Sequence, residues 1–267
     1  MTIAEWQTTA LKLLSNSPSV QLDISVLLSF VLNRPKSWVI AHSDEKLTRE
    51  QLSMLDKLIQ KRLESTPIAY LTGVKEFYGR SFAVSPHVLI PRPETEDLVE
   101  MLLSHAPNGQ ILDVGTGSGC LGITLALETN LEVTLSDISS DALGVARENA
   151  QRLGLSDIDT IESDLLEYWL KNGRVKFDII VANLPYVDPE WDTSPETTYE
   201  PSLALYTDDG GLELIYKLIQ QSISVLRSGG YLLIEADPVQ HESITHAANS
   251  NYKLIDSRGY GLLYQRK

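Results

Sequence analysis

The sequence is poor in the features that mark secreted, membrane-bound or metal-stabilised proteins. Its single cysteine, Cys120, excludes an internal disulfide and a zinc site built from cysteines. No apolar run approaches the roughly 20 residues that a transmembrane helix needs. The chain does not open with a charged segment followed by an apolar stretch, so no secretory signal is predicted. We therefore expect a cytoplasmic protein without a membrane partner.

Negative charge dominates the chain and is unevenly distributed. The net charge is −14; residues 1–80 hold 8 acidic and 10 basic side chains, whereas residues 81–267 hold 28 and 12. An acidic surface is a poor match for a phosphate backbone, so no direct nucleic-acid partner is expected. It suits a basic protein or a cationic cofactor, unless it serves only solubility. The five histidines lack metal-ligand spacing, so no metal site is predicted.

Hydrophobic periodicity divides the 267 residues into a helical part and an α/β part. Residues 1–72 show helix-spaced apolar positions and no catalytic constellation, which is typical of a helical bundle used for substrate docking. Residues 73–93 contain Phe77-Tyr78-Gly79-Arg80 between short apolar runs, which indicates a β-hairpin connector. Residues 94–267 alternate strands with helices, which predicts a doubly wound, mostly parallel sheet. The last two strands lie too close together for a crossover helix and should pair antiparallel at the edge.

The elements of this α/β part follow from its apolar runs and its stop signals. The predicted strands are Ile111–Val114, Glu132–Leu135, Ile158–Ile161, Phe177–Ala182, Tyr231–Glu235, Tyr252–Ile255 and Leu262–Gln265. The predicted helices are Cys120–Glu128, Asp141–Leu153 and Leu212–Leu226, the last of them closed by Ser228-Gly229-Gly230.

A glycine-rich turn joins the first of these strands to the first helix. It spans Gly115–Gly119, and glycine lets a ligand approach the backbone closely. Asp137 ends the next strand, where its carboxylate can accept both hydroxyls of a ribose. The turn also fits the dinucleotide pattern G-x-G-x-x-G, so a dehydrogenase must be considered. However, no obvious hydride-transfer acid follows at a strand end, and Asp113-x-Gly-x-Gly-x-Gly is the usual spacing for S-adenosylmethionine.

Two further segments follow predicted strands. Asp164 and Leu165 come after the third strand, where an adenine ring would lie between a carboxylate acceptor and an apolar face; the alternative is a plain loop. Asn183, Leu184, Pro185 and Tyr186 follow the fourth strand, at the edge where open α/β sheets bind ligands. The Asn183 side-chain oxygen and the Leu184 carbonyl can converge on one planar NH2 group beside the Tyr186 ring. These four residues therefore suit a carboxamide or the exocyclic amine of adenine.

In these motifs and their order, the chain resembles the release-factor glutamine N5-methyltransferases of the PrmC/HemK type. The resemblance runs from about residue 67 to the end, and Ile90-Pro91-Arg92-Pro93-Glu94-Thr95-Glu96 is its most discriminating stretch. The other matching stretches are Glu76-Phe77-Tyr78-Gly79, Asp113–Gly119, Asn183–Tyr186, Tyr199-Glu200-Pro201-x-x-Ala204-Leu205 and Asp209-Gly210-Gly211-Leu212.

The resemblance implies a Rossmann-like class I methyltransferase sheet that uses S-adenosylmethionine. The implied substrate is the glutamine of the Gly-Gly-Gln loop in class I peptide chain release factors, and a monomer is expected. The family usually has proline where this chain has Leu184, so the φ angle there is no longer fixed by a ring. The cofactor site is expected to comprise Gly115, Thr116, Gly117, Ser118, Gly119, Asp137, Asp164, Leu165 and Asn183. The catalytic and substrate-binding residues are expected to be Asn183, Leu184, Pro185 and Tyr186.

Several alternatives remain open at this point. Arg92 either lies over the substrate mouth, as a substrate-binding residue, or pairs with Glu94 or Glu96. The enzyme could instead methylate a ribosomal-protein glutamine or an adenine N6 amine, and a binding module that keeps the cofactor only as a structural ligand is a third class. An acidic loop follows the Asn183–Tyr186 stretch and would either receive a basic release-factor loop or form a solvated lid; its acids are Asp188, Glu190, Asp192, Glu196 and Glu200.

Overall fold

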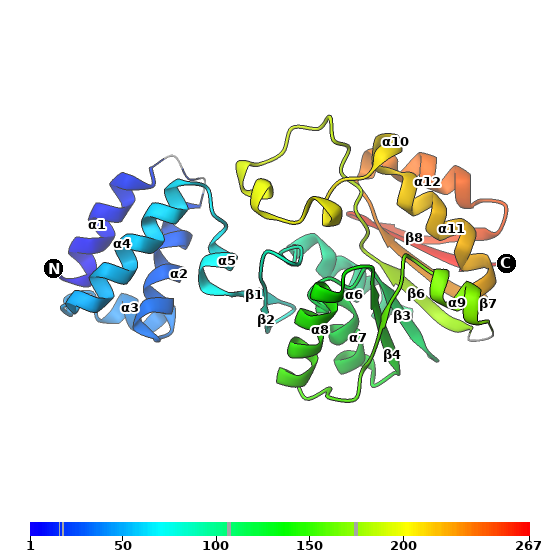
Figure 1. Ribbon diagram of the computed structural model, residues 1–267, viewed down its shortest axis with the longest axis horizontal. Helices are drawn as coiled ribbons and strands as arrows, with labels where there is room; N and C mark the ends of the chain where they lie inside the picture. The colour runs from blue at the N-terminus through cyan, green and yellow to red at the C-terminus, as the bar shows by residue number, and fades with distance from the viewer. Residues whose placement is uncertain (16, 18, 106–107, 174–175) are drawn as a thin grey trace. The chain divides into compact units, whose positions relative to one another are not determined.

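The computed structural model describes residues 1–15, 17, 19–105, 108–173 and 176–267 (Figure 1). Their contacts divide the chain into two compact units. One unit holds Met1–Val74 together with Ser194–Tyr199, and the other holds Lys75–Thr193 and Glu200–Lys267. None of the helices in the described ranges is long and apolar enough to cross a membrane.

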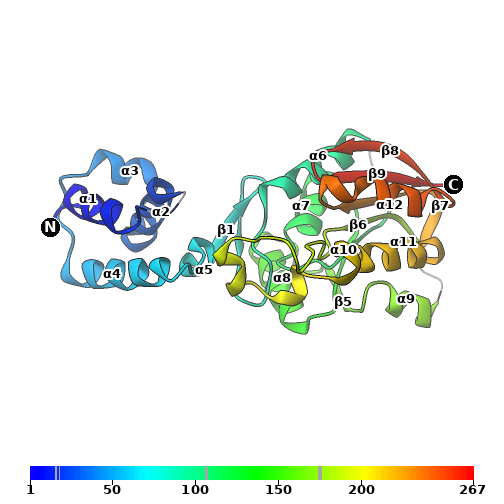
Figure 2. The ribbon, with the colours of Figure 1, turned by 90° about the horizontal axis from the view of Figure 1, so that it is seen from above.

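The first unit is built from short helices (Figure 2). Two of them begin with a capping box, in which the hydroxyl of Thr2 or Thr48 accepts the backbone N–H of the third helical residue. Their apolar faces bury one shared core that includes Trp6, Leu27 and Leu55. The helix-spaced apolar positions of the sequence thus meet in a single cluster. The helices are α1 (Ile3–Leu13), α2 (Val20–Leu32), α3 (Lys36–Ala41), α4 (Arg49–Leu63) and α5 (Ile68–Thr72).

A charged cluster is buried inside this helical unit. The Arg62 guanidinium donates to Asp23 at 2.8 Å and to Glu196 at 2.6 Å. The side chains of Arg62 and Asp23 are only 4% and 5% exposed. These bonds help to explain why Ser194–Tyr199 belongs with the helices although it is far from them in the sequence. No sequence pattern indicated this, because ion pairs between distant residues leave no periodic signal.

The predicted hairpin is confirmed as a two-stranded sheet of β1 (Val74–Phe77) and β2 (Arg80–Ala83). Its two turn residues, Tyr78 and Gly79, have φ angles of 49° and 70°. Positive φ at both positions is the geometry that matches the twist of a tight hairpin.

The α/β unit contains a seven-stranded sheet in the order β5-β4-β3-β6-β7-β9-β8 (Figure 1). Adjacent strands from β5 to β7 run parallel, whereas β9 is antiparallel to both β7 and β8. The predicted mostly parallel sheet with an antiparallel edge is therefore confirmed. The strands are β3 (Ile111–Val114), β4 (Val133–Asp137), β5 (Asp159–Glu162), β6 (Phe177–Ala182), β7 (Leu226–Glu235), β8 (Tyr252–Arg258) and β9 (Gly261–Arg266).

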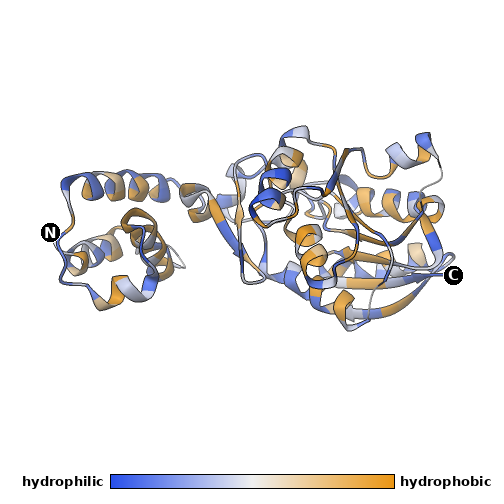
Figure 3. Cartoon of the chain, turned by 90° about the horizontal axis from the view of Figure 1, so that it is seen from below, coloured by the Kyte–Doolittle hydropathy of each residue, from blue (hydrophilic) through white to orange (hydrophobic). Residues whose placement is uncertain are grey.

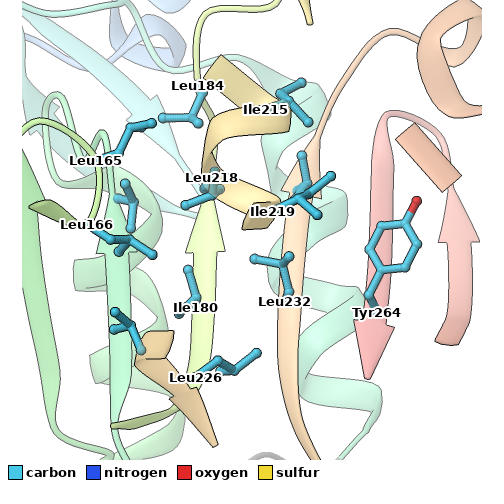
Figure 4. Close-up of a cluster of buried hydrophobic side chains, with 14 of the residues drawn as sticks. Leu165, Leu166, Ile180, Leu184, Ile215, Leu218, Ile219, Leu226, Leu232 and Tyr264 are labelled. Carbon is cyan, nitrogen blue, oxygen red and sulfur yellow. The ribbon is translucent and has the colours of Figure 1, made fainter. Parts of the chain in front are cut away.

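Helices cover both faces of this sheet. Successive strand residues point to opposite faces, so Ile179 joins the core beneath α6, α7 and α8, while Ile180 joins the core with α9, α11 and α12 (Figure 4). Hydrophobic residues accordingly line the strands and the helix sides that meet them (Figure 3). The helices are α6 (Glu96–Ser104), α7 (Cys120–Thr129), α8 (Ser140–Arg152), α9 (Glu167–Asn172), α10 (Asp208–Gly211), α11 (Glu213–Val225) and α12 (His241–Ala248).

One predicted helix end is wrong. The sequence predicted a helix through Leu226 that stops at Ser228-Gly229-Gly230. The structure ends α11 at Val225 and gives Leu226 an extended backbone, with ψ of 144°. The Ser-Gly-Gly residues instead lie inside β7, where the pairing with β6 shifts between Phe177 and Ile179. Glycine here accompanies an irregular stretch of the strand pair.

Candidate active site

A cavity opens at the carboxyl ends of β3, β4 and β6 and beside the loop after β5. This is the crevice in which open α/β sheets bind ligands. Of the expected site residues, Gly119 and Tyr186 are not part of its lining. The expected residues that do line it are Arg92, Gly115, Thr116, Gly117, Ser118, Asp137, Asp164, Leu165, Asn183, Leu184 and Pro185.

The glycine turn is fixed by contacts on its protein side. The Gly117 N–H donates to Asp137 Oδ2 at 2.9 Å. Gly119 has a φ angle of 81°, and a Cβ there would lie 2.6 Å from the Cδ1 atom of Ile123. Glycine is therefore required at this position by both backbone conformation and space. Although Gly119 does not line the cavity, it lets the turn enter α7.

Asp137 retains capacity to bind a ligand. Its two oxygens accept the N–H groups of Gly117 and Ser139, each at 2.9 Å. Burial raises the pKa of this carboxyl despite those bonds. Each carboxylate oxygen has a second acceptor position, so Asp137 can also receive two neighbouring hydroxyl groups. This chemistry fits a ribose.

Asp113 is a buried acid in β3, just before the glycine turn begins. Its Oδ2 accepts the Thr116 hydroxyl at 2.6 Å and the Gly122 N–H at 3.0 Å. Burial raises its pKa to about 7. Among the described residues no lysine or arginine forms an ion pair with it. A buried acid without a cationic neighbour favours a positively charged ligand.

The loop after β5 combines a charged and an apolar group. The Lys217 ammonium donates to Asp164 Oδ2 at 2.8 Å, which leaves Oδ1 as the acceptor for a ligand amine. Leu165 is buried and has a φ angle of 46°. That conformation costs a non-glycine residue roughly 1–2 kcal/mol, so the surroundings must hold it in place. Leu165 and Leu184 point toward each other in Figure 4 and belong to one buried cluster.

The Asn183–Pro185 stretch borders the same cavity as the glycine turn. The Asn183 Nδ2 group donates to the Thr95 hydroxyl at 3.1 Å. Leu184 is 4% exposed, and its Cδ2 lies 2.9 Å from where a Cβ on Gly115 would be. Packing against Gly115 therefore restrains Leu184, which replaces part of the restraint that a proline ring would supply.

Tyr186 is held at both its backbone and its hydroxyl. Its carbonyl accepts the Gln240 side-chain amide at 2.8 Å, and its hydroxyl donates to Glu235 Oε1 at 3.3 Å. A Cβ on Gly211 would lie 2.0 Å from the Tyr186 carbonyl oxygen, so the Asp-Gly-Gly turn packs directly against this backbone. The ring centroid is 6.4 Å from that of Tyr260. Tyr186 is therefore held next to the residues that line the cavity, although it is not among them.

Arg92 pairs with an acid that the sequence did not suggest. Its guanidinium donates to Glu200 Oε1 at 2.5 Å, and Glu200 Oε2 accepts the Ile90 N–H at 3.0 Å. The expectation that Arg92 pairs with Glu94 or Glu96 is therefore wrong. Glu96 instead accepts the Tyr78 N–H. Arg92 also lines the cavity, so its expected place at the mouth is compatible with this pairing.

Some acids of the loop after Tyr186 form ion pairs within the chain. Glu196 binds Arg62 in the helical unit, and Glu200 binds Arg92 in the α/β unit. Two of its five acids are therefore neutralised within the chain. The two expectations, a dock for a basic loop and a solvated lid, therefore concern the other three acids, Asp188, Glu190 and Asp192.

Sequence reasoning missed three residues that support the site, namely Thr95, Glu235 and Gln240. Thr95 was named only as part of the Ile90–Glu96 stretch that carries the family resemblance, without a role of its own. Glu235 ends β7 beside β6, and an acid at the carboxyl end of a buried strand is a signal that could have identified it. Gln240 is buried and reaches two backbone carbonyls, which no pattern foretells.

Comparisons with known proteins agree with this architecture. Residues 105–259 match the family model of a methyltransferase domain, and residues 5–73 match that of the PrmC N-terminal domain. A solved ribosomal protein L11 methylase from Lactobacillus delbrueckii subsp. bulgaricus is 27% identical, with a TM-score of 0.50; the match covers 66% of this chain and 80% of that one. The fold and the cavity thus define a methyltransferase.

Relatives of known name show to which family of methyltransferases the chain belongs. A release factor glutamine methyltransferase of Koribacter versatilis is 40% identical, and the match covers 97% of this chain and 96% of that protein. The protein of the same name from Escherichia coli K12 is 38% identical over 92% and 90% of the two chains. This chain belongs to the release factor glutamine methyltransferase family.

Proposed function

We propose that this chain transfers the methyl group of S-adenosylmethionine to a glutamine side-chain nitrogen. The substrate would be the glutamine in the Gly-Gly-Gln loop of class I peptide chain release factors, and the enzyme would act in the cytoplasm as a monomer. One observation carries the proposal. The Asn183–Pro185 stretch, which can hold an amide, and the glycine turn with Asp137, which can hold a nucleoside, line one cavity.

The residues of the cavity fit S-adenosylmethionine, which supplies an electrophilic methyl group on a sulfonium. Asp137 would accept the ribose hydroxyls, and Asp164 with Leu165 would bind the adenine ring. The buried acid of Asp113 lies near the glycine turn and suits the cationic methionine end. The three carboxyl groups therefore correspond to three different parts of this cofactor.

The substrate amide would be activated mainly by positioning. Its nitrogen is a weak nucleophile because its lone pair is delocalised into the carbonyl. Asn183 Oδ1 and the Leu184 carbonyl would each accept one N–H, which would aim the lone pair at the methyl group. None of the loop and turn hydrogen bonds between described backbone groups ends on the Leu184 carbonyl, so this oxygen is available. Tyr186 would stack on the amide plane, and Arg92 would bind the substrate at the cavity mouth.

The experiment that tests this function is a methyl-transfer assay with labelled S-adenosylmethionine. Purified release factor should be labelled, whereas a release factor whose Gly-Gly-Gln glutamine is changed to alanine should not. Ribosomal protein L11, duplex DNA and RNA serve as alternative acceptors. Labelling of one of these in preference to release factor would overturn the proposed substrate, and labelling of none would overturn the proposed activity.

A further inference from the structure

The end of β7 places an acid beside the amide-holding stretch, the four residues Asn183–Tyr186. Ala182 of β6 pairs with Ile234 of β7, so the next residues along the two strands, Asn183 and Glu235, are neighbours at the carboxyl edge of the sheet. Glu235 has no exposed surface. A fully buried carboxyl is costly unless it is bonded, and natural proteins keep such groups mainly where they serve a purpose.

Three side chains interact with the Glu235 carboxylate, and two of them belong to the amide-holding stretch. The Tyr186 hydroxyl donates to Oε1 at 3.3 Å, and Thr95 and Asn183 also interact with this carboxylate through their side chains. Burial raises the pKa of Glu235 to about 7, and these donors oppose that shift. Oε2 makes no hydrogen bond of normal geometry within the described part of the chain. The carboxylate therefore has spare acceptor capacity next to Asn183.

This network decides which way the Asn183 carboxamide faces. Its Nδ2 group donates to the Thr95 hydroxyl at 3.1 Å. Thr95 also interacts with the Glu235 carboxylate through its side chain. Since an ionised carboxylate can only accept, the Thr95 hydroxyl serves as the donor toward Glu235 and as the acceptor from Asn183. An ionised carboxylate only accepts hydrogen bonds, so a flipped carboxamide would bring its oxygen toward acceptors and lose the bond to Thr95. The unflipped carboxamide leaves Oδ1 as the atom that can accept a substrate N–H.

We propose that Glu235 and Thr95 are positioning residues that lock the orientation of the Asn183 carboxamide, so that it presents its oxygen to the substrate amide. The inference deepens the proposed function and rests on it for the identity of the substrate. Glu235 also accepts a hydrogen bond from the Tyr186 hydroxyl, so one carboxylate positions the side chains of two of the four residues in the stretch. Neither Glu235 nor Thr95 needs to touch the reacting atoms.

The lock can be tested without any methyl acceptor. In protein labelled with ¹⁵N-asparagine and saturated with S-adenosylhomocysteine, the Asn183 side-chain resonances are identified by their absence in Asn183→Ala. Their hydrogen exchange should be slow in the parent and in Thr95→Ser, which keeps the hydroxyl. Exchange should be at least about tenfold faster in Thr95→Val, which corresponds to the loss of roughly one hydrogen bond.

A matched control is available in α7. Thr124 is also fully buried, but its hydroxyl has no hydrogen-bond partner among the described residues. Thr124→Val makes the same chemical change as Thr95→Val and should leave the exchange of the Asn183 side chain unaltered. Unchanged exchange in Thr95→Val, or an equal acceleration in Thr124→Val, would overturn the lock.

Kinetics supply a second readout. Glu235→Gln replaces an acceptor by a group that also donates, so it should lower kcat by about tenfold while the KM for release factor changes less than about twofold. Thr95→Val should also lower kcat in the parent but should have no further effect in an Asn183→Ala background, because Thr95 acts through the Asn183 carboxamide. Additive losses would contradict the inference. A parent enzyme inactive on release factor would refute the proposed function and leave the exchange test valid.

Discussion

A buried acid of the helical unit and two buried acids of the α/β unit are stabilised in opposite ways. In the helical unit, Asp23 is matched by the Arg62 guanidinium at 2.8 Å. In the α/β unit, Asp113 and Glu235 are buried against hydroxyls and amides, and burial raises both pKa values to about 7. The charge of Asp23 is balanced within the fold, whereas Asp113 and Glu235 form no ion pair with a described lysine or arginine and can attract cations and hydrogen-bond donors. The comparison separates buried charge that holds the fold from buried charge that serves the site.

Arg62→Met should destabilise the helical unit by more than any other change considered below. Burial lowers the pKa of Arg62, but its bonds to Asp23 and Glu196 outweigh this and raise it overall, so the cation is tightly held. Removing one partner of a buried ion pair costs about 3–5 kcal/mol of unfolding free energy. Denaturant unfolding measures this loss. The Asp23→Leu/Arg62→Met double variant should recover part of it, and the affinity for S-adenosylhomocysteine should not change.

Asn183→Ala should show the reverse pattern, a loss of activity without a loss of stability. We expect kcat to fall by about 100- to 1,000-fold, the usual effect of removing one positioned hydrogen-bonding group from an active site. Single-turnover methyl transfer measures it, and the unfolding midpoint serves as the control. Near-normal turnover would show that the carboxamide does not hold the substrate.

Asp137→Ala, in the α/β unit, should weaken binding of the cofactor more than it lowers turnover. Losing two charge-assisted hydrogen bonds to the ribose should weaken S-adenosylhomocysteine binding by about 10- to 100-fold, measured by calorimetry. Asp141→Ala, which removes an exposed acid at the start of α8, is the matched control. If both variants bind equally well, Asp137 does not contact the ribose.

The pH dependence of stability offers the smallest expected effect. The pKa of Glu235 is raised from 4.5 to about 7 in the folded protein, so between these values the folded state holds more protons than the unfolded state. Stability from this group is therefore present at low pH and is lost as pH rises through about 7. Relative to the parent, Glu235→Gln should gain roughly 2 kcal/mol of unfolding free energy between pH 5 and pH 8. A difference that does not vary with pH would mean that Glu235 stays ionised throughout.

The sequence predicted the architecture well because periodicity and strand-end motifs are local signals. Ile111–Val114 and Phe177–Ala182 were predicted with the observed bounds, and Gly115–Ser118 and Asp137, which the sequence singled out, line one cavity. What escaped prediction depends on pairs far apart in the chain. The bonds of Arg92 to Glu200 and of Arg62 to Glu196 span 108 and 134 residues, and no local pattern encodes such a pairing.

The residues that hold the amide-holding stretch in place were not predicted from the sequence for a related reason. Thr95, Glu235 and Gln240 come from three separate elements and meet only when the sheet is assembled. The partner of the Tyr186 hydroxyl could not be predicted either, because Glu235 becomes its neighbour only through the pairing of β6 with β7.

The membership of Ser194–Tyr199 in the helical unit has a practical consequence for engineering. The polypeptide passes from one unit to the other three times, after Val74, after Thr193 and again after Tyr199. Deleting the first 74 residues would leave Glu196 without its ion-pair partner Arg62. Grafting only those residues onto a homologue would transfer Arg62 without Glu196. Chimeras that exchange substrate preference should therefore transplant the helices and the short insert as one cassette.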